Sequence, residues 1–143
     1  DGVPKDFVEA VNLFRKAAKQ ESAEAQYNLG NCYNFGEGVS RDPTEAVKWY
    51  RKAAEQGFAE AQYNLGVCYY FGEGVSRDQT EAVKWFHKAA EQEFAEAQYF
   101  LGNGYLNGEG VSQDSVEAAK WFHKATEQGH EEAIKVMREL NVE

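Results

Sequence analysis

The chain repeats one 36-residue pattern four times, and this periodicity limits the folds that are open to it. The two central copies, Glu37–Gly72 and Glu73–Gly108, are identical at 27 of 36 positions. A period of about 36 residues is typical of solenoids built from helical pairs, in which each unit buries its apolar face against its neighbours. The sequence therefore predicts one all-α domain over residues 1–143, an α/α solenoid with repeat units 1–36, 37–72, 73–108 and 109–143.

Charge and hydropathy exclude two classes of partner. The net charge is −9, from 24 acidic and 15 basic side chains, whereas nucleic-acid binding needs clustered lysine and arginine. No apolar run approaches the roughly 18 residues of a membrane-spanning helix, and no signal peptide opens the chain. We expect a soluble chain with no nucleic-acid partner and no membrane insertion, and the pattern indicates no particular compartment.

The two cysteines, Cys32 and Cys68, occupy the same place in successive repeats. An intervening helix should hold their Cα atoms beyond the roughly 7 Å that a disulfide tolerates. Two distant thiols are too few ligands for a metal, and His87, His123 and His130 are not spaced to complete a site. We expect buried free thiols, with a disulfide as the alternative, and neither a metal nor a cofactor.

Each repeat opens with a helix start. Asp42 can cap the helix, Pro43 suits its first position, and Glu45 follows the cap by three residues. Asp6, Asp78 and Asp114 begin the other copies in the same way, and apolar residues then recur on one helix face. We predict helices over 6–20, 23–35, 42–56, 59–71, 78–92, 95–107, 114–128 and 130–140.

Glycines mark the turns and one close helix contact. Gly57 ends a first helix where a left-handed residue is expected, but Glu21 and Glu93 stand at the equivalent positions. We expect both glutamates to adopt that conformation at a cost of about 1 kcal/mol each. Recurring mid-helix glycines should admit a neighbouring helix closely, and recurring tryptophans and tyrosines should pack in the core: Gly30, Gly66, Gly102; Trp49, Trp85, Trp121; Tyr33, Tyr69, Tyr105.

The first copy begins within a turn, with no second helix before it. Val8, Val11 and Phe14 should therefore leave an apolar strip uncovered. We expect the chain to be a segment of a longer array. Association of two molecules through the open solenoid ends is the alternative.

Two segments carry a family resemblance. Residues 65–78, LGVCYYFGEGVSRD, and 82–90, AVKWFHKAA, resemble the Sel1-like repeat, a relative of the tetratricopeptide repeat. The resemblance covers essentially the whole chain. Departures are Leu13, which replaces the tryptophan, and the charged last helix, which lacks the Leu-Gly-x-x-Tyr motif. The resemblance implies a right-handed superhelix that acts as a protein–protein interaction scaffold.

Variation between the two central copies gathers on the second helix, where five of their nine differences lie within residues 64–71. In tetratricopeptide-like stacks this helix lines a concave groove. The alternative is drift at solvent-facing positions. We predict a peptide-binding face formed by Tyr27, Asn28, Asn31, Asn34, Phe35, Tyr63, Asn64, Val67, Tyr70, Phe71, Tyr99, Phe100, Asn103 and Leu106.

The predicted face suits a protein or peptide partner. Aromatic side chains offer large contact areas, and asparagine amides can both donate to and accept from a bound backbone. A glutamate ladder on the same helices favours a basic partner, although glutamates also favour helix N-termini for local reasons. The ladder consists of Glu24, Glu60, Glu96 and Glu132, and the lysines of the first helices read as a solvated face.

No catalytic motif is present. The chain lacks Ser-x-x-Lys, Gly-x-Ser-x-Gly and a phosphate-cradling glycine pattern. Some Sel1-like proteins with paired cysteines in each repeat have been linked to β-lactam binding, but this chain lacks those pairs. We therefore expect no enzyme. The alternatives are a β-lactam-binding or hydrolysing relative and a consensus-like designed scaffold without a native ligand.

Overall fold

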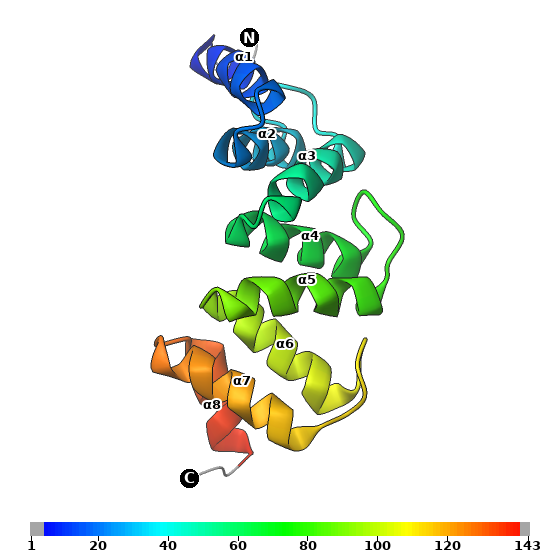
Figure 1. The fold of residues 1–143 in the computed structure, drawn as a ribbon, viewed down its shortest axis with the longest axis vertical. Coiled ribbons are helices and arrows are strands. Elements are labelled where there is room, and N and C mark those ends of the chain that lie inside the picture. Colours follow the sequence, from blue (N-terminus) through cyan, green and yellow to red (C-terminus); the bar gives the residue numbers. More distant parts are fainter. Residues whose placement is uncertain (1–4, 141–143) are drawn as a thin grey trace. The chain divides into compact units, whose positions relative to one another are not determined.

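The computed structural model describes residues 5–140, which form eight α-helices and no strand (Figure 1). Every helix end lies within one residue of its predicted position, so the predicted all-α architecture is confirmed. The helices are α1 (Lys5–Lys19), α2 (Ala23–Phe35), α3 (Pro43–Glu55), α4 (Ala59–Phe71), α5 (Gln79–Glu91), α6 (Ala95–Asn107), α7 (Ser115–Glu127) and α8 (Glu131–Glu139).

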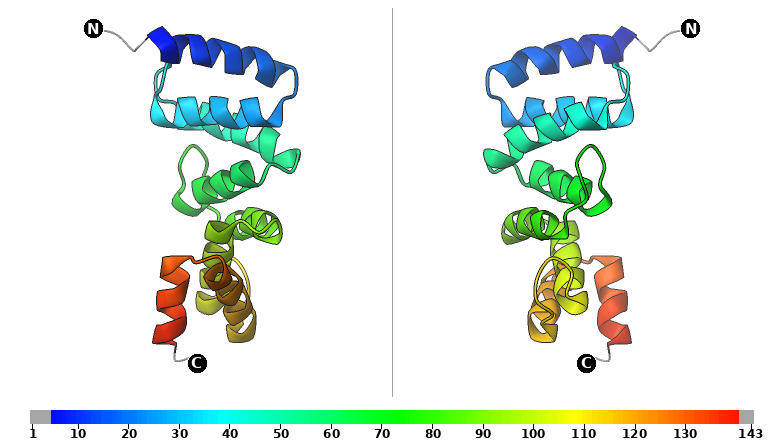
Figure 2. Two further views of the ribbon diagram at one scale, coloured as in Figure 1. Left: turned by 90° about the vertical axis from the view of Figure 1, so that its left-hand side faces the viewer. Right: turned by 90° about the vertical axis from the view of Figure 1, so that its right-hand side faces the viewer.

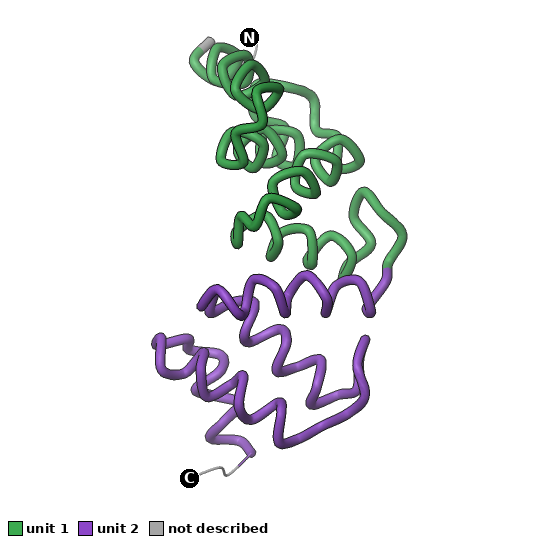
Figure 3. The backbone as a smooth tube through the Cα atoms, viewed as in Figure 1, with its two compact units in different colours: residues 1–77 green, residues 78–143 purple. Residues whose placement is uncertain are grey.

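Consecutive helices pack against each other within two compact units. In the first unit α1 lies alongside α2, which packs on α3, and α3 packs on α4 (Figure 2). In the second unit α5 packs on α6, α6 on α7, and α7 on α8. The first unit comprises residues 1–77 and the second comprises residues 78–143 (Figure 3).

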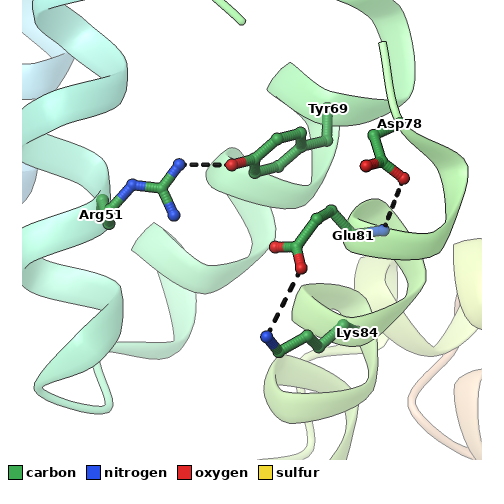
Figure 4. Close-up of polar contacts among 5 residues, drawn as sticks. All are labelled: Arg51, Tyr69, Asp78, Glu81 and Lys84. Carbon is green, nitrogen blue, oxygen red and sulfur yellow. Dashed lines mark hydrogen bonds and ion pairs between the residues drawn. The ribbon is translucent and has the colours of Figure 1, made fainter. Parts of the chain in front are cut away.

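Aspartates start three of the first helices. The Asp78 carboxylate accepts a hydrogen bond from the backbone nitrogen of Glu81 at 3.1 Å (Figure 4). Asp42 and Asp114 cap α3 and α7 in the same way, and such caps contribute about 1 kcal/mol each. The predicted cap at Asp6 is wrong, because α1 begins one residue earlier and Asp6 lies inside its first turn.

In two repeats, a glycine in the second helix contacts an aromatic ring on the first helix of the following repeat. A Cβ atom added to Gly30 would lie 2.7 Å from the ring of Tyr50, and one added to Gly102 would lie 2.7 Å from the ring of Phe122. Both rings are at most 1% exposed. The predicted close approach is therefore confirmed at these two positions, and it brings α2 onto α3 and α6 onto α7.

The contact at Gly102 gives the first prediction. A helical Gly→Ala change ordinarily stabilises by about 1 kcal/mol. At Gly102 the new methyl group would overlap the Phe122 ring, which costs about 1–3 kcal/mol. Gly102→Ala should therefore lower the free energy of unfolding measured with urea. In a Phe122→Leu background, where the ring is gone, the same change should stabilise, and a gain in the unaltered protein would contradict the close contact.

The turns after α1 and α5 contain residues with left-handed backbone. Among the described residues, positive φ outside glycine occurs at Glu21 (68°) and Glu93 (67°), as predicted. At the equivalent turn, Gly57 has a φ of 90°, and an added Cβ would meet no described atom within 4 Å. A side chain at this turn position therefore meets no steric clash. The free-energy cost of a glutamate there comes from its positive φ.

Glu93→Gly should raise the free energy of unfolding by about 1 kcal/mol, because glycine adopts positive φ without strain. Glu93→Ala is the matched control, since it removes the carboxylate and keeps the strain. Chemical denaturation should show the gain for glycine alone. Equal gains from both variants would assign the effect to the charge.

The predicted apolar strip on α1 is partly wrong. Val11 is 2% exposed and packs in a core cluster with Leu29, against which Phe14 also packs. The turn after α2 covers Val11, because a Cβ on Gly38 would lie 2.6 Å from its Cγ2 atom. Val8 is exposed as predicted, and the other exposed large apolar side chains of this helix are Phe7 and Leu13.

Candidate functional site

A cavity of about 180 Å³ opens among α2, α3 and α4 in the first unit. Five residues of the predicted binding face line it, together with three that the sequence analysis did not select. The five are Asn34, Phe35, Tyr63, Asn64 and Val67, and the three are Tyr50, Cys68 and Glu73.

Three side chains form a hydrogen-bonded network at this cavity. The Tyr50 hydroxyl donates to Asn31 Oδ1 at 2.6 Å, and Asn64 Nδ2 donates to the same oxygen at 3.4 Å. Tyr50 is 1% exposed, and this burial raises the pKa of its hydroxyl well above the usual range. The hydroxyl therefore stays protonated at physiological pH and remains a donor that holds Asn31 in place.

The network depends on one departure from the repeat. The other copies carry phenylalanine at the position of Tyr50, as at Phe86 and Phe122. In the second unit Phe86 stacks on Phe100, with ring centroids 5.1 Å apart and an interplanar angle of 18°. The second copy has Tyr50 and Asn64 where the third copy has Phe86 and Phe100. This paired change from apolar to polar residues was the sequence signal that could have identified Tyr50.

The other predicted residues of the first unit lie on α2 and α4, and Tyr27 among them contacts the network. Tyr27 packs against the rings of Tyr50 and Phe58, with centroids 6.1 and 5.3 Å apart. Asn28 lies half-buried on α2. Tyr70 and Phe71 form an edge-to-face pair, 4.9 Å between centroids, near the end of α4, and Phe71 is 60% exposed.

In the second unit the predicted aromatic residues pack against their neighbours. The ring of Tyr99 stacks on His130, 4.8 Å between centroids, and also packs on Phe122 at 6.0 Å. Leu106 packs against the core cluster around Phe122. Asn103 lies half-buried on α6. Of the predicted face, the structure therefore joins Asn31 and Asn64 by hydrogen bonds in the first unit and packs Tyr99, Phe100 and Leu106 against other side chains in the second.

The glutamate ladder is not uniform. Glu96 Oε1 lies 2.7 Å from Nε2 of His130, whose Nδ1 accepts from the backbone nitrogen of Ala133 at 3.1 Å. The imidazole thus caps α8 and places its proton on the nitrogen that faces Glu96. Glu24 is exposed and Glu60 is half-buried, each in the first turn of its helix.

A charged pair and a thiol border the cavity. Glu73 Oε2 lies 3.3 Å from Arg41 Nη2, and Arg41 Nε donates to the backbone oxygen of Asn34 at 2.9 Å. Cys32 and Cys68 are both free and buried, as predicted. Burial, reinforced by the negative charge of Glu73, raises the pKa of Cys68 to about 11.

The raised pKa predicts slow alkylation of Cys68. Thiolate is the reactive form, so a pKa of about 11 in place of 9.0 lowers the reactive fraction at pH 8 roughly 100-fold. Iodoacetamide labelling followed by mass spectrometry should show this protection in the folded protein and its loss in urea. Glu73→Gln should speed labelling modestly, whereas full reactivity in the folded state would contradict the buried thiol.

Neither a metal site nor a membrane span is found in the part of the chain that the structure describes. Residues 5–140 contain no group of three or more His, Cys, Asp or Glu side chains placed to hold a metal ion. No helix in that range is long and apolar enough to cross a bilayer.

Two solved structures resemble the chain in both sequence and fold. One is c5321, a protective antigen present in uropathogenic Escherichia coli strains and displaying an SLR fold, with 49% identity over 87% of this chain and a TM-score of 0.85. This chain spans only 27% of that protein. The other is a Sel1 repeat protein from Oxalobacter formigenes, with 39% identity, 88% of this chain and 95% of that chain covered, and a TM-score of 0.82.

A third structure shares the fold at lower identity, and the sequence repeats match a family. Helicobacter pylori cysteine rich protein B is 24% identical over 94% of this chain and 97% of its own, with a TM-score of 0.73. No curated protein matches the chain significantly. The Sel1 repeat model matches residues 1–22, 23–58, 59–94 and 95–130. The chain, an all-α repeat solenoid, therefore belongs to the Sel1 repeat family.

Proposed function

We propose that the chain is a protein–protein interaction scaffold that binds a peptide segment of a partner at the cavity of the first unit. Sel1 repeat proteins generally serve as protein-interaction scaffolds. The observation that carries the finer proposal is the network of Asn31, Tyr50 and Asn64 at a cavity with apolar walls.

The network presents hydrogen-bonding groups that suit a peptide backbone. Asn31 Oδ1 accepts two hydrogen bonds, and no described residue accepts from its amide nitrogen. Asn64 gives one amide hydrogen to Asn31 and also hydrogen-bonds with the Tyr50 hydroxyl, so its side-chain oxygen is the group that can accept from a peptide N–H. Because Tyr50 fixes Asn31 and Asn31 in turn orients Asn64, these amides lose little rotamer freedom when a peptide binds.

Apolar walls beside the amides supply contact area. Phe35 is 65% exposed at the cavity, and Tyr63 and Val67 are half-buried there. Aromatic side chains next to oriented polar groups are typical of sites where a few residues carry most of the binding energy. The net charge of −9 favours a basic segment, and Glu73 adds a carboxylate at the cavity itself.

The test starts from a peptide selected on the protein from a phage-displayed random library. A single cavity with one amide network supports an affinity in the micromolar range, about −8 kcal/mol. Asn64→Ala should weaken binding by about 1–3 kcal/mol, because backbone groups of the peptide lose their partner. Isothermal titration calorimetry measures the change, and circular dichroism should show unchanged helicity.

Lys48→Ala is the matched control in the same unit. Lys48 pairs with Glu45 at 3.5 Å on the exposed face of α3, and its removal should leave the affinity unchanged. If Lys48→Ala weakens binding and Asn64→Ala does not, the outer surface of the first helices carries recognition and the proposed site is wrong.

A further inference from the structure

In the first unit, the same arginine–tyrosine hydrogen bond joins the two helices of each repeat. Arg15 on α1 donates from Nη2 to the hydroxyl of Tyr33 on α2 at 3.1 Å. Arg51 on α3 donates to the hydroxyl of Tyr69 on α4 in the same way (Figure 4). Its guanidinium carbon also lies 5.5 Å from the centroid of the Tyr69 ring. Each of these two tyrosines thus has an arginine of its own repeat as partner.

The second unit keeps the tyrosine and lacks the arginine. His87 stands at the position of Arg51, and Tyr105 at that of Tyr69. The imidazole instead contacts other groups: its Nδ1 lies 2.6 Å from Glu91 Oε1, and the ring forms a T-shaped pair with Trp121, with centroids 5.5 Å apart. Among the described residues no side chain donates to the Tyr105 hydroxyl. The shorter side chain therefore leaves an acceptor without its usual donor.

The space that the arginine would fill is open. A cavity of about 400 Å³ lies between α5 and α6, and His87, Glu91 and Tyr105 are among the residues that line it. Its tyrosine hydroxyl is the same acceptor that binds a guanidinium at two places in the first unit. We propose that this cavity binds the guanidinium group of an arginine side chain from a partner protein, which donates to Tyr105 as Arg51 donates to Tyr69.

Two lysines line the cavity, and each has a partner on its own helix. Lys84 is held by Glu81 at 3.4 Å, and the ammonium of Lys88 lies 5.7 Å from the centroid of Trp85. The first unit has the same arrangement beside Arg51: Lys48 pairs with Glu45 at 3.5 Å, and Lys52 lies over Trp49 at 5.8 Å. A guanidinium therefore already occupies such surroundings within this chain.

The charges that face Tyr105 favour a cation. Burial raises the pKa of Tyr105, and the carboxylates of Glu117 and Asp114 raise it further. Carboxylates that oppose a negative phenolate attract a positive guanidinium at the same place. Glu91 adds a carboxylate at the cavity wall. A planar guanidinium can both lie over the tyrosine ring and donate to its hydroxyl, which a lysine ammonium does less well.

The test uses N-acetyl-L-arginine methylamide as the probe and follows the Tyr105 and His87 resonances by NMR. A single side chain in one site supports a dissociation constant on the order of 1 mM. We expect saturable shifts, with binding of the lysine analogue at least about 5-fold weaker because it lacks the planar donor pair. Absence of saturable shifts at 50-fold the expected constant would overturn the proposal, as would equal binding of both analogues.

Three variants distinguish binding of the probe in this cavity from nonspecific binding to the protein surface. His87→Arg supplies the missing side chain from within and should weaken probe binding more than about 10-fold while keeping or raising the melting temperature. Tyr105→Phe removes the acceptor and should weaken binding several-fold, whereas His87→Ala leaves the space open and should retain it. Unaltered binding by His87→Arg would refute the site. Asn64→Ala should not affect this probe, so the outcome is independent of the peptide site in the first unit.

Discussion

The contact on which each unit depends is an aromatic ring seated on a helical glycine. Gly30 receives Tyr50 and Gly102 receives Phe122, at separations that no side chain larger than hydrogen would permit. Each glycine weakens its own helix by about 1 kcal/mol. The close approach offsets that cost, because it buries a large ring completely and brings two helix backbones together. The position of one helix on the next is therefore determined by a residue that has no side chain.

That constraint explains where a polar site can arise. A flat aromatic ring fits against the glycine, and the contact at Gly30 does not restrict the para position, where tyrosine carries its hydroxyl. Tyrosine and phenylalanine both satisfy the packing, so a hydroxyl can be added at position 50 without disturbing the stack. Once added, it needs a partner because it is buried. Asn31 supplies that partner and Asn64 extends the network to the cavity.

The repeat made the helices predictable, since apolar spacing, caps and glycines recur in most copies. Even the strained turn at Glu93 follows from comparison with Gly57. Contacts that cross from one repeat to the next were harder to predict. Val11 was expected to be uncovered, yet the turn at Gly38 covers it. Tyr50 was missed for the same reason: its importance comes from residues 19 positions before and 14 positions after it, not from its own helix.

The two sites arise from opposite changes to one scaffold. At Tyr50 the chain gains a polar group, and the surrounding asparagines are organised by it. At position 87 the repeat loses the guanidinium that Arg51 supplies, and among residues 5–140 no side chain donates to the Tyr105 hydroxyl. Positions that are identical in every copy serve the fold, through packing between neighbouring helices or through helix capping. A ligand-binding role is therefore to be sought where one copy departs from the others and leaves polar atoms that the repeat itself does not use.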